Sequence, residues 1–233
     1  MLRRRAVSWW DIPTWAQISI SRTCSARCSF AWGEIHVGRA LAESHNPQLG
    51  RNGESAWRPG RAAKSRRVVV AGAGPAGLQA ARIAAERGHN VTLFGASSHP
   101  GGKLRWEGGL PGKAEHLAVV AWMERQAKAA GVRTELGHSA TTSDILAARP
   151  DSVIVATGSH QRRLDNFSGD GVSARDWTAR PHGGRTEATA VLFDMDHGAA
   201  TYAVADALAR DYRKLVLLTP RQDGARIASD RLF

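Results

Sequence analysis

The chain has 233 residues, of which 42% are hydrophobic and 23% are charged, proportions that are ordinary for a globular protein with a substantial core. Its two cysteines, Cys24 and Cys28, are too few for a disulfide framework, and no apolar run approaches the length of a membrane span. We therefore expect a soluble, cytoplasmic protein with no membrane partner. The net charge of +11 comes mostly from dispersed arginines without a recognition motif, so nucleic acid is an unfavoured partner.

The first part of the chain predicts little regular structure. Residues 1–23 form a basic, tryptophan-rich extension that begins with Arg3, Arg4 and Arg5. This start is similar to that of a signal peptide, but no continuous apolar segment or small-residue cleavage site follows it, and a mitochondrial transit peptide is the other arginine-rich option. Residues 24–63 are punctuated by glycine and proline, which is typical of an irregular linker.

Residues 66–94 contain a glycine-rich turn between a predicted strand and a predicted helix. The β-branched run 68–70 predicts a strand buried on both faces, and small and aliphatic residues at helical spacing predict a helix over 76–87. Residues 90–94 predict the next strand. The turn between the first strand and the helix reads Gly72-Ala73-Gly74-Pro75-Ala76-Gly77. Within a unit of about thirty residues, this motif predicts a dinucleotide site.

Each glycine of the turn has an expected role. Gly72 permits the tight turn, Gly74 lets the backbone approach a pyrophosphate, and Gly77 lets the helix pack closely on the strand. The first turn of the helix then offers free N–H groups and a partial positive charge to the phosphates. The other interpretation is a glycine-rich unit that binds nothing.

The rest of the chain predicts an α/β fold in two nucleotide-binding-like domains, 64–160 and 186–233, separated by a polar boundary segment. The connecting turn of the second domain contains Asp194 and Asp196, whose carboxylates repel a pyrophosphate. That domain is therefore either a packing domain or a weak nucleotide binder. The predicted elements are a glycine-rich loop 95–104, a helix 113–130, a strand 132–136, a short helix 143–148, a buried strand that runs into a turn over 152–159, and the boundary 162–185. They are followed by a second βαβ unit with strand 188–193, helix 199–210 and strand 215–218.

Several motifs together give the chain a family resemblance. They are Ile35-His36-Val37-Gly38-Arg39 with His45-Asn46-Pro47, the glycine turn, Pro100-Gly101-Gly102-Lys103-Leu104, Leu110-Pro111-Gly112-Lys113, and Pro150-Asp151 with Ala156-Thr157-Gly158. In this order they resemble the C-terminal region of the NADH:flavin oxidoreductase family, which includes 2,4-dienoyl-CoA reductase, trimethylamine dehydrogenase and N-methyl-amine demethylases. The resemblance implies a Rossmann-like domain for FAD or ADP with a second nucleotide domain inserted in it. Family members also have an FMN-containing TIM barrel and a four-cysteine [4Fe–4S] cluster, through which electrons pass.

The sequence departs from the family plan at the barrel, the cluster and the C-terminal end. Too few residues precede Cys24 for a barrel, and at Phe233 the chain is still within the inserted domain, so the segment that closes the FAD domain is expected to be missing. Of the four cluster positions only Cys24 holds a cysteine, so we expect no intact iron–sulfur cluster. The other cluster positions are occupied by Arg27, Ala31 and Glu43. Zinc binding by Cys24 and Cys28 with His36 and His45 is disfavoured by their spacing.

The acidic residue that ends the second strand in the family is replaced by Gly95. An acid at this position accepts hydrogen bonds from the adenosine ribose, and its loss weakens binding by roughly 1.5–3 kcal/mol, or about ten- to a hundred-fold. The glycine also leaves room for a 2′-phosphate, although the sequence alone indicates no positioned arginine.

The resemblance implies an FAD/NAD(P)-binding oxidoreductase-type domain that exchanges electrons with a flavin barrel on a separate subunit. The expected cofactor is FAD or ADP, with NAD(P)H as a further candidate, and no metal site is expected. The alternative is a non-catalytic domain that binds ADP or another nucleotide, or a partner. No nucleophile–base pair or carboxylate dyad indicates a catalytic residue. The candidate cofactor-binding residues are Gly72, Gly74, Pro75, Ala76, Gly77, Gly102, Lys103, Ala156, Thr157 and Gly158.

Overall fold

The structure, a computed structural model, describes residues 59–160, 171–180, 184, 186–195 and 198–219. Internal contacts divide the chain into two compact units, with the boundary between Arg58 and Pro59. The predictions for residues 1–58, including the extension, the cysteine motif and most of the linker, therefore lie outside the described residues. The domain boundaries proposed from the sequence stay predictions.

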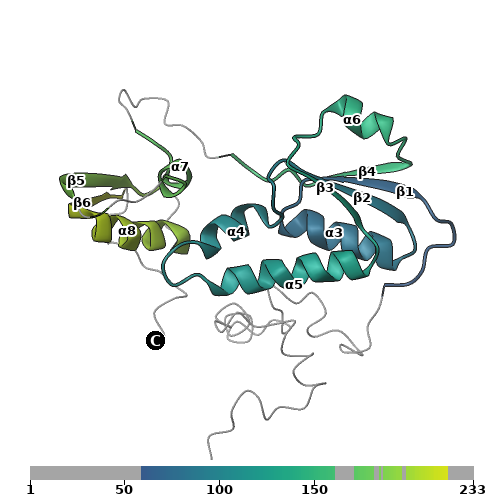
Figure 1. The fold of residues 1–233 in the computed structure, drawn as a ribbon, viewed down its shortest axis with the longest axis horizontal. Helices are drawn as coiled ribbons and strands as arrows, with labels where there is room; N and C mark the ends of the chain where they lie inside the picture. Colours follow the sequence, from purple (N-terminus) through teal and green to yellow (C-terminus); the bar gives the residue numbers. More distant parts are fainter. Residues whose placement is uncertain (1–58, 161–170, 181–183, 185, 196–197, 220–233) are drawn as a thin grey trace, which may run out of the picture. The chain divides into compact units, whose positions relative to one another are not determined.

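A four-stranded parallel sheet organises the first described region (Figure 1). Its strands are β1 (Arg67–Ala71), β2 (Asn90–Gly95), β3 (Arg133–Leu136) and β4 (Ser152–Val155), in the order β3-β2-β1-β4. Val70 of β1 pairs with Leu93 of β2 on one side and with Ile154 of β4 on the other. The predicted α/β fold with a parallel sheet is confirmed.

Helices α3 (Pro75–Glu86) and α5 (Glu115–Ala129) cover one face of this sheet (Figure 1). Leu78 and Ala81 of α3 are buried, with exposed fractions of 2% and 0%, and Ala85 is partly buried. They belong to one hydrophobic core with strand residues and with the end of α5. The buried residues of this core are Val68, Val70, Ala73, Leu78, Ala81, Ala84, Val91, Leu93, Ala127 and Val132.

A buried arginine links α3 to α5. The Arg82 side chain is nearly inaccessible to solvent, and its Nη1 lies 3.2 Å from Glu86 Oε1 one helical turn later. Its guanidinium also lies 5.6 Å from the centre of the Trp122 ring, which is a cation–π distance. This contact joins the two helices.

The face of the sheet opposite α3 and α5 is only partly covered, and side chains of β4 (Ser152–Val155) are exposed on it. The side chain of Ile154 points to the α3 core, whereas Val153 and Val155 on the other face are 43% and 75% exposed. Alternate residues of a strand face opposite sides, so burial of one face does not imply burial of the other. The sequence predicted a buried strand here, and this prediction is wrong for the face that carries Val153 and Val155. Figure 1 shows the short helix α6 (Thr142–Ala147) on the side of the sheet away from α3 and α5.

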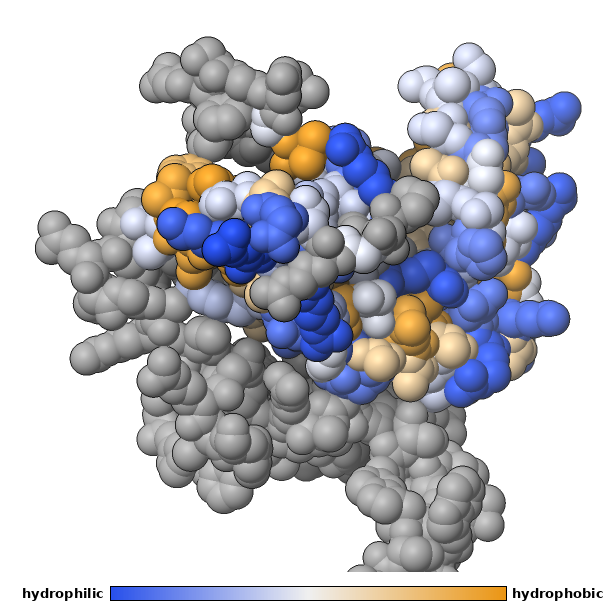
Figure 2. Space-filling view, turned by 60° about the vertical axis from the view of Figure 1, so that its left-hand side comes forward, coloured by the Kyte–Doolittle hydropathy of each residue, from blue (hydrophilic) through white to orange (hydrophobic). Residues whose placement is uncertain are grey.

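The second βαβ unit is also confirmed. Strands β5 (Thr186–Phe193) and β6 (Tyr212–Leu218) pair in parallel, and α8 (Ala199–Asp211) connects them. Val204 and Leu208 of α8 are buried against this sheet. Hydrophobic residues also reach the surface in patches among hydrophilic ones (Figure 2), and Val191 and Phe193 of β5 are 60% and 44% exposed.

Two short helices were not predicted. Helix α4 (Gly102–Gly108) lies where the sequence predicted the end of a loop, and α7 (Ala174–Thr178) lies within the predicted boundary segment. Helix α4 follows Gly101 and begins at Gly102, both with positive φ, and such glycines are typical of turns. In the described parts of the chain, no helix has the length and apolarity that crossing a bilayer requires.

Candidate functional site

The glycine turn between β1 and α3 leaves no room for side chains at two of its positions. Gly72 has φ +113°, and a Cβ added there would overlap the carbonyl group of Ala156. A Cβ added at Gly77 would overlap the carbonyl oxygen of Gly72. These contacts agree with the expected roles of Gly72 in the tight turn and Gly77 in close helix packing.

Gly74 differs from these two glycines because a Cβ added there would meet no atom within 4 Å. Its φ of −76° is open to any residue, so backbone strain does not require glycine here. The second glycine-rich loop borders this position, since a Cβ added at Gly102 would lie 3.1 Å from the α-carbon of Gly74. The Gly101 N–H also donates to the Ala73 carbonyl at 2.8 Å. Gly74 therefore faces open space beside the loop that contains Lys103.

The turn after β4 is the third segment at this site. The Ala156 N–H donates to the Ala71 carbonyl at 2.7 Å, which holds the turn against the end of β1. Thr157 and Gly158 follow, both exposed. The chain moves outward from β1 to β3 and then returns to the other side of β1, so β1 and β4 meet at the topological switch point of the sheet. Ligands of open α/β sheets bind outside the carboxyl ends of the strands at this place.

The N-terminus of α3 has the features of an anion-binding site. Pro75 occupies the first turn, the capping residue Gly74 has no side-chain cap, and no acidic residue lies in the first turn. The first N–H groups of a helix have no partner within the helix, and the helix dipole places partial positive charge there. A phosphate group suits such a position. The structure thus brings the predicted residues of all three segments together.

Gly95, where the family has an acid, lies at the buried end of β2. A Cβ added there would lie 2.7 Å from Ala73 Cβ and 2.7 Å from Leu136 Cδ2. Neighbouring side chains therefore occupy the space that an acidic residue would need. The expectation that the glycine itself leaves room for a 2′-phosphate is therefore wrong, because Ala73 and Leu136 fill this space.

A hydrogen-bonded cap follows β3 at the same edge of the sheet. Asp144 accepts from the Thr141 N–H at 2.7 Å, from the Thr141 hydroxyl at 2.7 Å and from His138 Nε2 at 2.9 Å. The hydrogen bonds from Thr141, followed by that from His138, lower the pKa of Asp144 from 3.8 to about 2. The His138 N–H donates to the Gly95 carbonyl at 3.3 Å, so the cap is tied to the end of β2. Sequence reasoning missed this capping box, although its Thr-x-x-Asp spacing is a recognisable signal.

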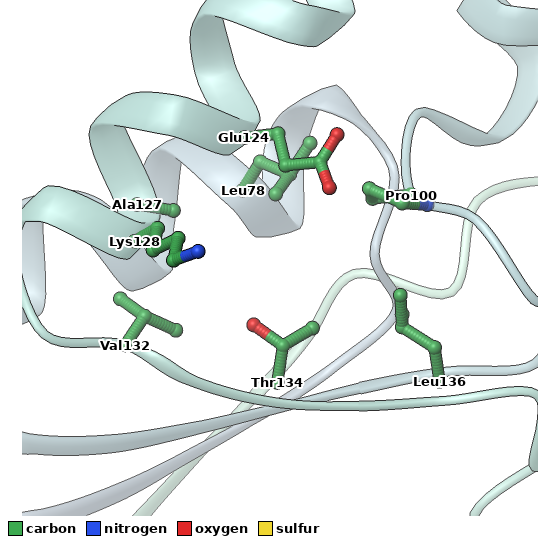
Figure 3. A pocket seen from close by; sticks show the side chains of 8 residues that line it. All are labelled: Leu78, Pro100, Glu124, Ala127, Lys128, Val132, Thr134 and Leu136. Atoms are coloured by element: carbon green, nitrogen blue, oxygen red, sulfur yellow. The ribbon is translucent and has the colours of Figure 1, made fainter.

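A separate cavity of about 290 Å³ lies between α5 and β3 (Figure 3). Its walls are largely apolar, with Ala127 and Val132 on one side and Leu136 and Pro100 on the other, and Glu124 on α5 adds a carboxylate. None of the predicted cofactor-binding residues lines this cavity. It adjoins the closed position at Gly95 through the shared side chain of Leu136.

The corresponding turn of the second βαβ unit contains a buried carboxylate. Asp194 is fully buried, and its Oδ2 accepts a hydrogen bond from the Tyr202 hydroxyl at 3.1 Å. Its N–H donates to the Leu218 carbonyl at 2.7 Å, next to the end of β6. An acid in this position is unfavourable for binding a pyrophosphate, as the sequence indicated. Residues 196–197, which include the other acid of the turn, lie outside the described residues.

No group of three or more His, Cys, Asp or Glu side chains arranged to hold a metal ion occurs among the described residues. The cysteines lie outside that part of the chain. The expected absence of an iron–sulfur cluster therefore stays a prediction.

The family model of the pyridine nucleotide-disulphide oxidoreductases matches residues 66–191, more than half of the 233 residues. The chain belongs to this family. The match begins just before β1 and extends into β5, so it includes all three segments of the site. It confirms an oxidoreductase-type, Rossmann-like domain and the general class of flavin and nicotinamide nucleotide cofactors.

Similar proteins agree with the resemblance to NADH:flavin oxidoreductases. A probable N-methylproline demethylase of Rhizobium meliloti (strain 1021) is 31% identical over 82% of this chain and 28% of its own length. An NADH oxidase of Thermoanaerobacter brockii is 38% identical over 61% of this chain and 22% of its own length. The solved structure of histamine dehydrogenase from Rhizobium sp. 4-9 matches with a TM-score of 0.74 and 28% identity, over 90% of this chain and 33% of that one. The chain thus spans a third or less of the length of these relatives.

Proposed function

We propose that the chain binds an adenine dinucleotide, FAD or NAD(P)H, with its pyrophosphate at the N-terminus of α3. The observation that supports this most directly is the open space at Gly74, next to an uncapped helix end and bordered by Gly102. A backbone without a side chain at this point allows phosphate oxygens to reach the free N–H groups.

The residues of the site have distinct roles in this proposal. The backbone from Gly72 to Gly77 holds the pyrophosphate, and Gly102 keeps the second loop close to it. The Lys103 side chain is 63% exposed, and its Nζ is 3.8 Å from Glu107, so its weakly held ammonium group can turn toward a phosphate. The turn from Ala156 to Gly158 lies alongside the dinucleotide.

The bound cofactor supplies hydride or electron transfer, and the protein binds and orients it. We also propose that the electrons pass to or from an FMN-containing barrel, for which a separate subunit is one candidate. The organisation of the family that this chain resembles, in which such a barrel accompanies the nucleotide domains, supports the barrel as the electron partner. No residue of the chain is proposed as a catalytic acid or base.

Calorimetric titration of the full chain with FAD, ADP and NADPH tests the proposal, together with the visible absorption spectrum of the purified protein. We expect one adenine nucleotide to bind with 1:1 stoichiometry. If none of the three binds while the protein melts cooperatively, the proposed function is wrong.

The second candidate function is non-catalytic binding of ADP or a related nucleotide. The closed position at Gly95 favours it, because a dinucleotide then lacks the carboxylate that normally anchors the adenosine ribose. The same titration separates the two functions. Tight binding of ADP, without binding of FAD or NADPH, identifies the non-catalytic domain.

A further inference from the structure

We propose that the site at the glycine turn selects an adenine nucleotide with a 2′-phosphate, as in NADP(H), over FAD and NAD(H). This inference rests on the proposed function and names the cofactor of the same site. Three observations support it: the glycine at the end of β2, the residue types in the loop that follows, and an arginine bonded to that loop.

The end of β2 presents no carboxylate to the adenosine ribose. A carboxylate at this position accepts hydrogen bonds from a free 2′-hydroxyl and repels a 2′-phosphate. Ala73 and Leu136 occupy the space next to Gly95, so a neighbouring acid cannot take over the role from this direction. The preference for a free ribose is therefore lost, and the main repulsion of a 2′-phosphate is lost with it.

The loop after β2 contains donors and no acids. From Gly95 to Trp106 the sequence has no Asp or Glu, whereas it has two serines, a histidine and two permanent cations. Ser97, Ser98 and His99 are exposed, and Ser98 Oγ lies 3.0 Å from His99 Nδ1. Hydroxyl and imidazole groups so close together can donate to the same phosphate group.

The backbone of this loop is fixed from the β3 side. The carbonyls of Gly95 and Ser97 accept hydrogen bonds from the N–H groups of His138 and Gly137, at 3.3 Å and 3.0 Å. These bonds use the backbone acceptors and leave the serine side chains exposed. The cap next to this loop contains one carboxylate, that of Asp144. It accepts hydrogen bonds from Thr141 and His138, and these donors partly offset its negative charge.

Arg105 supplies the cation whose position the sequence alone did not indicate. Its Nε donates to the Pro100 carbonyl at 2.7 Å, which anchors the guanidinium to the end of the loop. Across the part of the chain that the structure describes, no carboxylate lies within ion-pair distance of Arg105. Guanidinium groups bind phosphate through several N–H donors at once, and an arginine near the ribose is a known means of accepting a 2′-phosphate.

The direct test is calorimetric titration of the full chain with NADP⁺ and NAD⁺, which differ only in the 2′-phosphate, and with FAD. We expect NADP⁺ to bind at least about ten-fold more tightly than NAD⁺, the effect of one or two charge-assisted hydrogen bonds. Ser98→Ala and Arg105→Met should each reduce this ratio several-fold. Arg210→Met, on the surface of α8, is the matched control and should leave the ratio unchanged. Thermal melting shows whether each variant is folded, and Ser98→Ala alone still tests the idea if Arg105→Met does not fold.

Because the chain is basic, ADP and ATP are titrated as a control for unspecific attraction of negative charge. A preference for ATP over ADP as large as that for NADP⁺ over NAD⁺ would overturn the inference. Equal binding of NAD⁺ and NADP⁺, or tighter binding of FAD, would also overturn it while leaving the proposed function in place. If no adenine nucleotide binds, both the inference and the proposed function are wrong.

Discussion

The two βαβ units of this chain share a topology and differ in the chemistry of their first turn. In the first unit, glycines join β1 to α3, and the helix N-terminus is left without a cap or an acid. In the second unit, Asp194 lies in the turn between β5 and α8, fully buried and bonded to Tyr202. The fold therefore does not decide whether such a unit can hold a phosphate. We expect the residue types at the carboxyl end of the first strand to decide it.

The largest expected effect is a loss of stability when a side chain is added in the closely packed first turn, between β1 and α3. Gly77→Ala places a methyl group on the Gly72 carbonyl oxygen, and backbone atoms there cannot move aside easily. We expect the free energy of unfolding to fall by about 3 kcal/mol or more, measured by urea denaturation. Gly60→Ala, at an exposed position with no atom within 4 Å of the added Cβ, is the control. Equal stability of the two variants would contradict the role assigned to Gly77.

We expect the stability of the second turn, between β5 and α8, to depend on a side-chain hydrogen bond and not on close packing at a glycine. Tyr202→Phe removes the donor to the buried carboxylate of Asp194 and keeps the size of the ring. Removing one partner of a buried hydrogen bond costs about 1–3 kcal/mol, and the unfolding free energy should fall by about that amount or less. Nucleotide binding at the first turn should not change. A variant with lower nucleotide affinity but unchanged stability would show that the comparison between the two turns is wrong.

The two regions also differ in how exposed their acidic side chains are, since Asp194 is buried and Asp144 is exposed. Asp144, in the cap after β3, is exposed and has a pKa of about 2 in the folded protein, below its ordinary value of 3.8. The ionised carboxylate therefore stabilises the fold above about pH 4, and this contribution is lost as the pH falls from about 4 to 2. Asp144→Asn should make the melting temperature less dependent on pH in this range. An unchanged pH dependence would exclude Asp144 as a source of acid sensitivity.

Local patterns predicted most elements of the first region well. Helix α3 was predicted over 76–87 and spans Pro75–Glu86, because its apolar spacing and the glycines on either side define both ends. Gly88, which follows the helix, has a left-handed backbone with φ +93°. Strand β2 was predicted within one residue for the same reason.

Features that depend on distant residues were not predictable in this way. A run of apolar residues predicts strand β4, but whether Val153 and Val155 are covered depends on what packs on that face. The closure around Gly95 depends on Leu136, forty-one residues later in the numbering. The position of Arg105 depends on helix α4, which starts at a pair of glycines that the sequence pattern assigns to a loop.

We expect phosphate oxygens to meet the N-terminus of α3 in the open space at Gly74. Gly74→Ala tests it most directly, because its methyl group enters open space at a backbone conformation that alanine adopts readily. Affinity for adenine nucleotides is measured by calorimetry on the full chain, with urea denaturation of the same samples. We expect Gly74→Ala to fold as stably as the parent protein and to bind the nucleotide at least about ten-fold more weakly, a loss equivalent to about 1.4 kcal/mol. Unchanged affinity in a stably folded Gly74→Ala variant would contradict it.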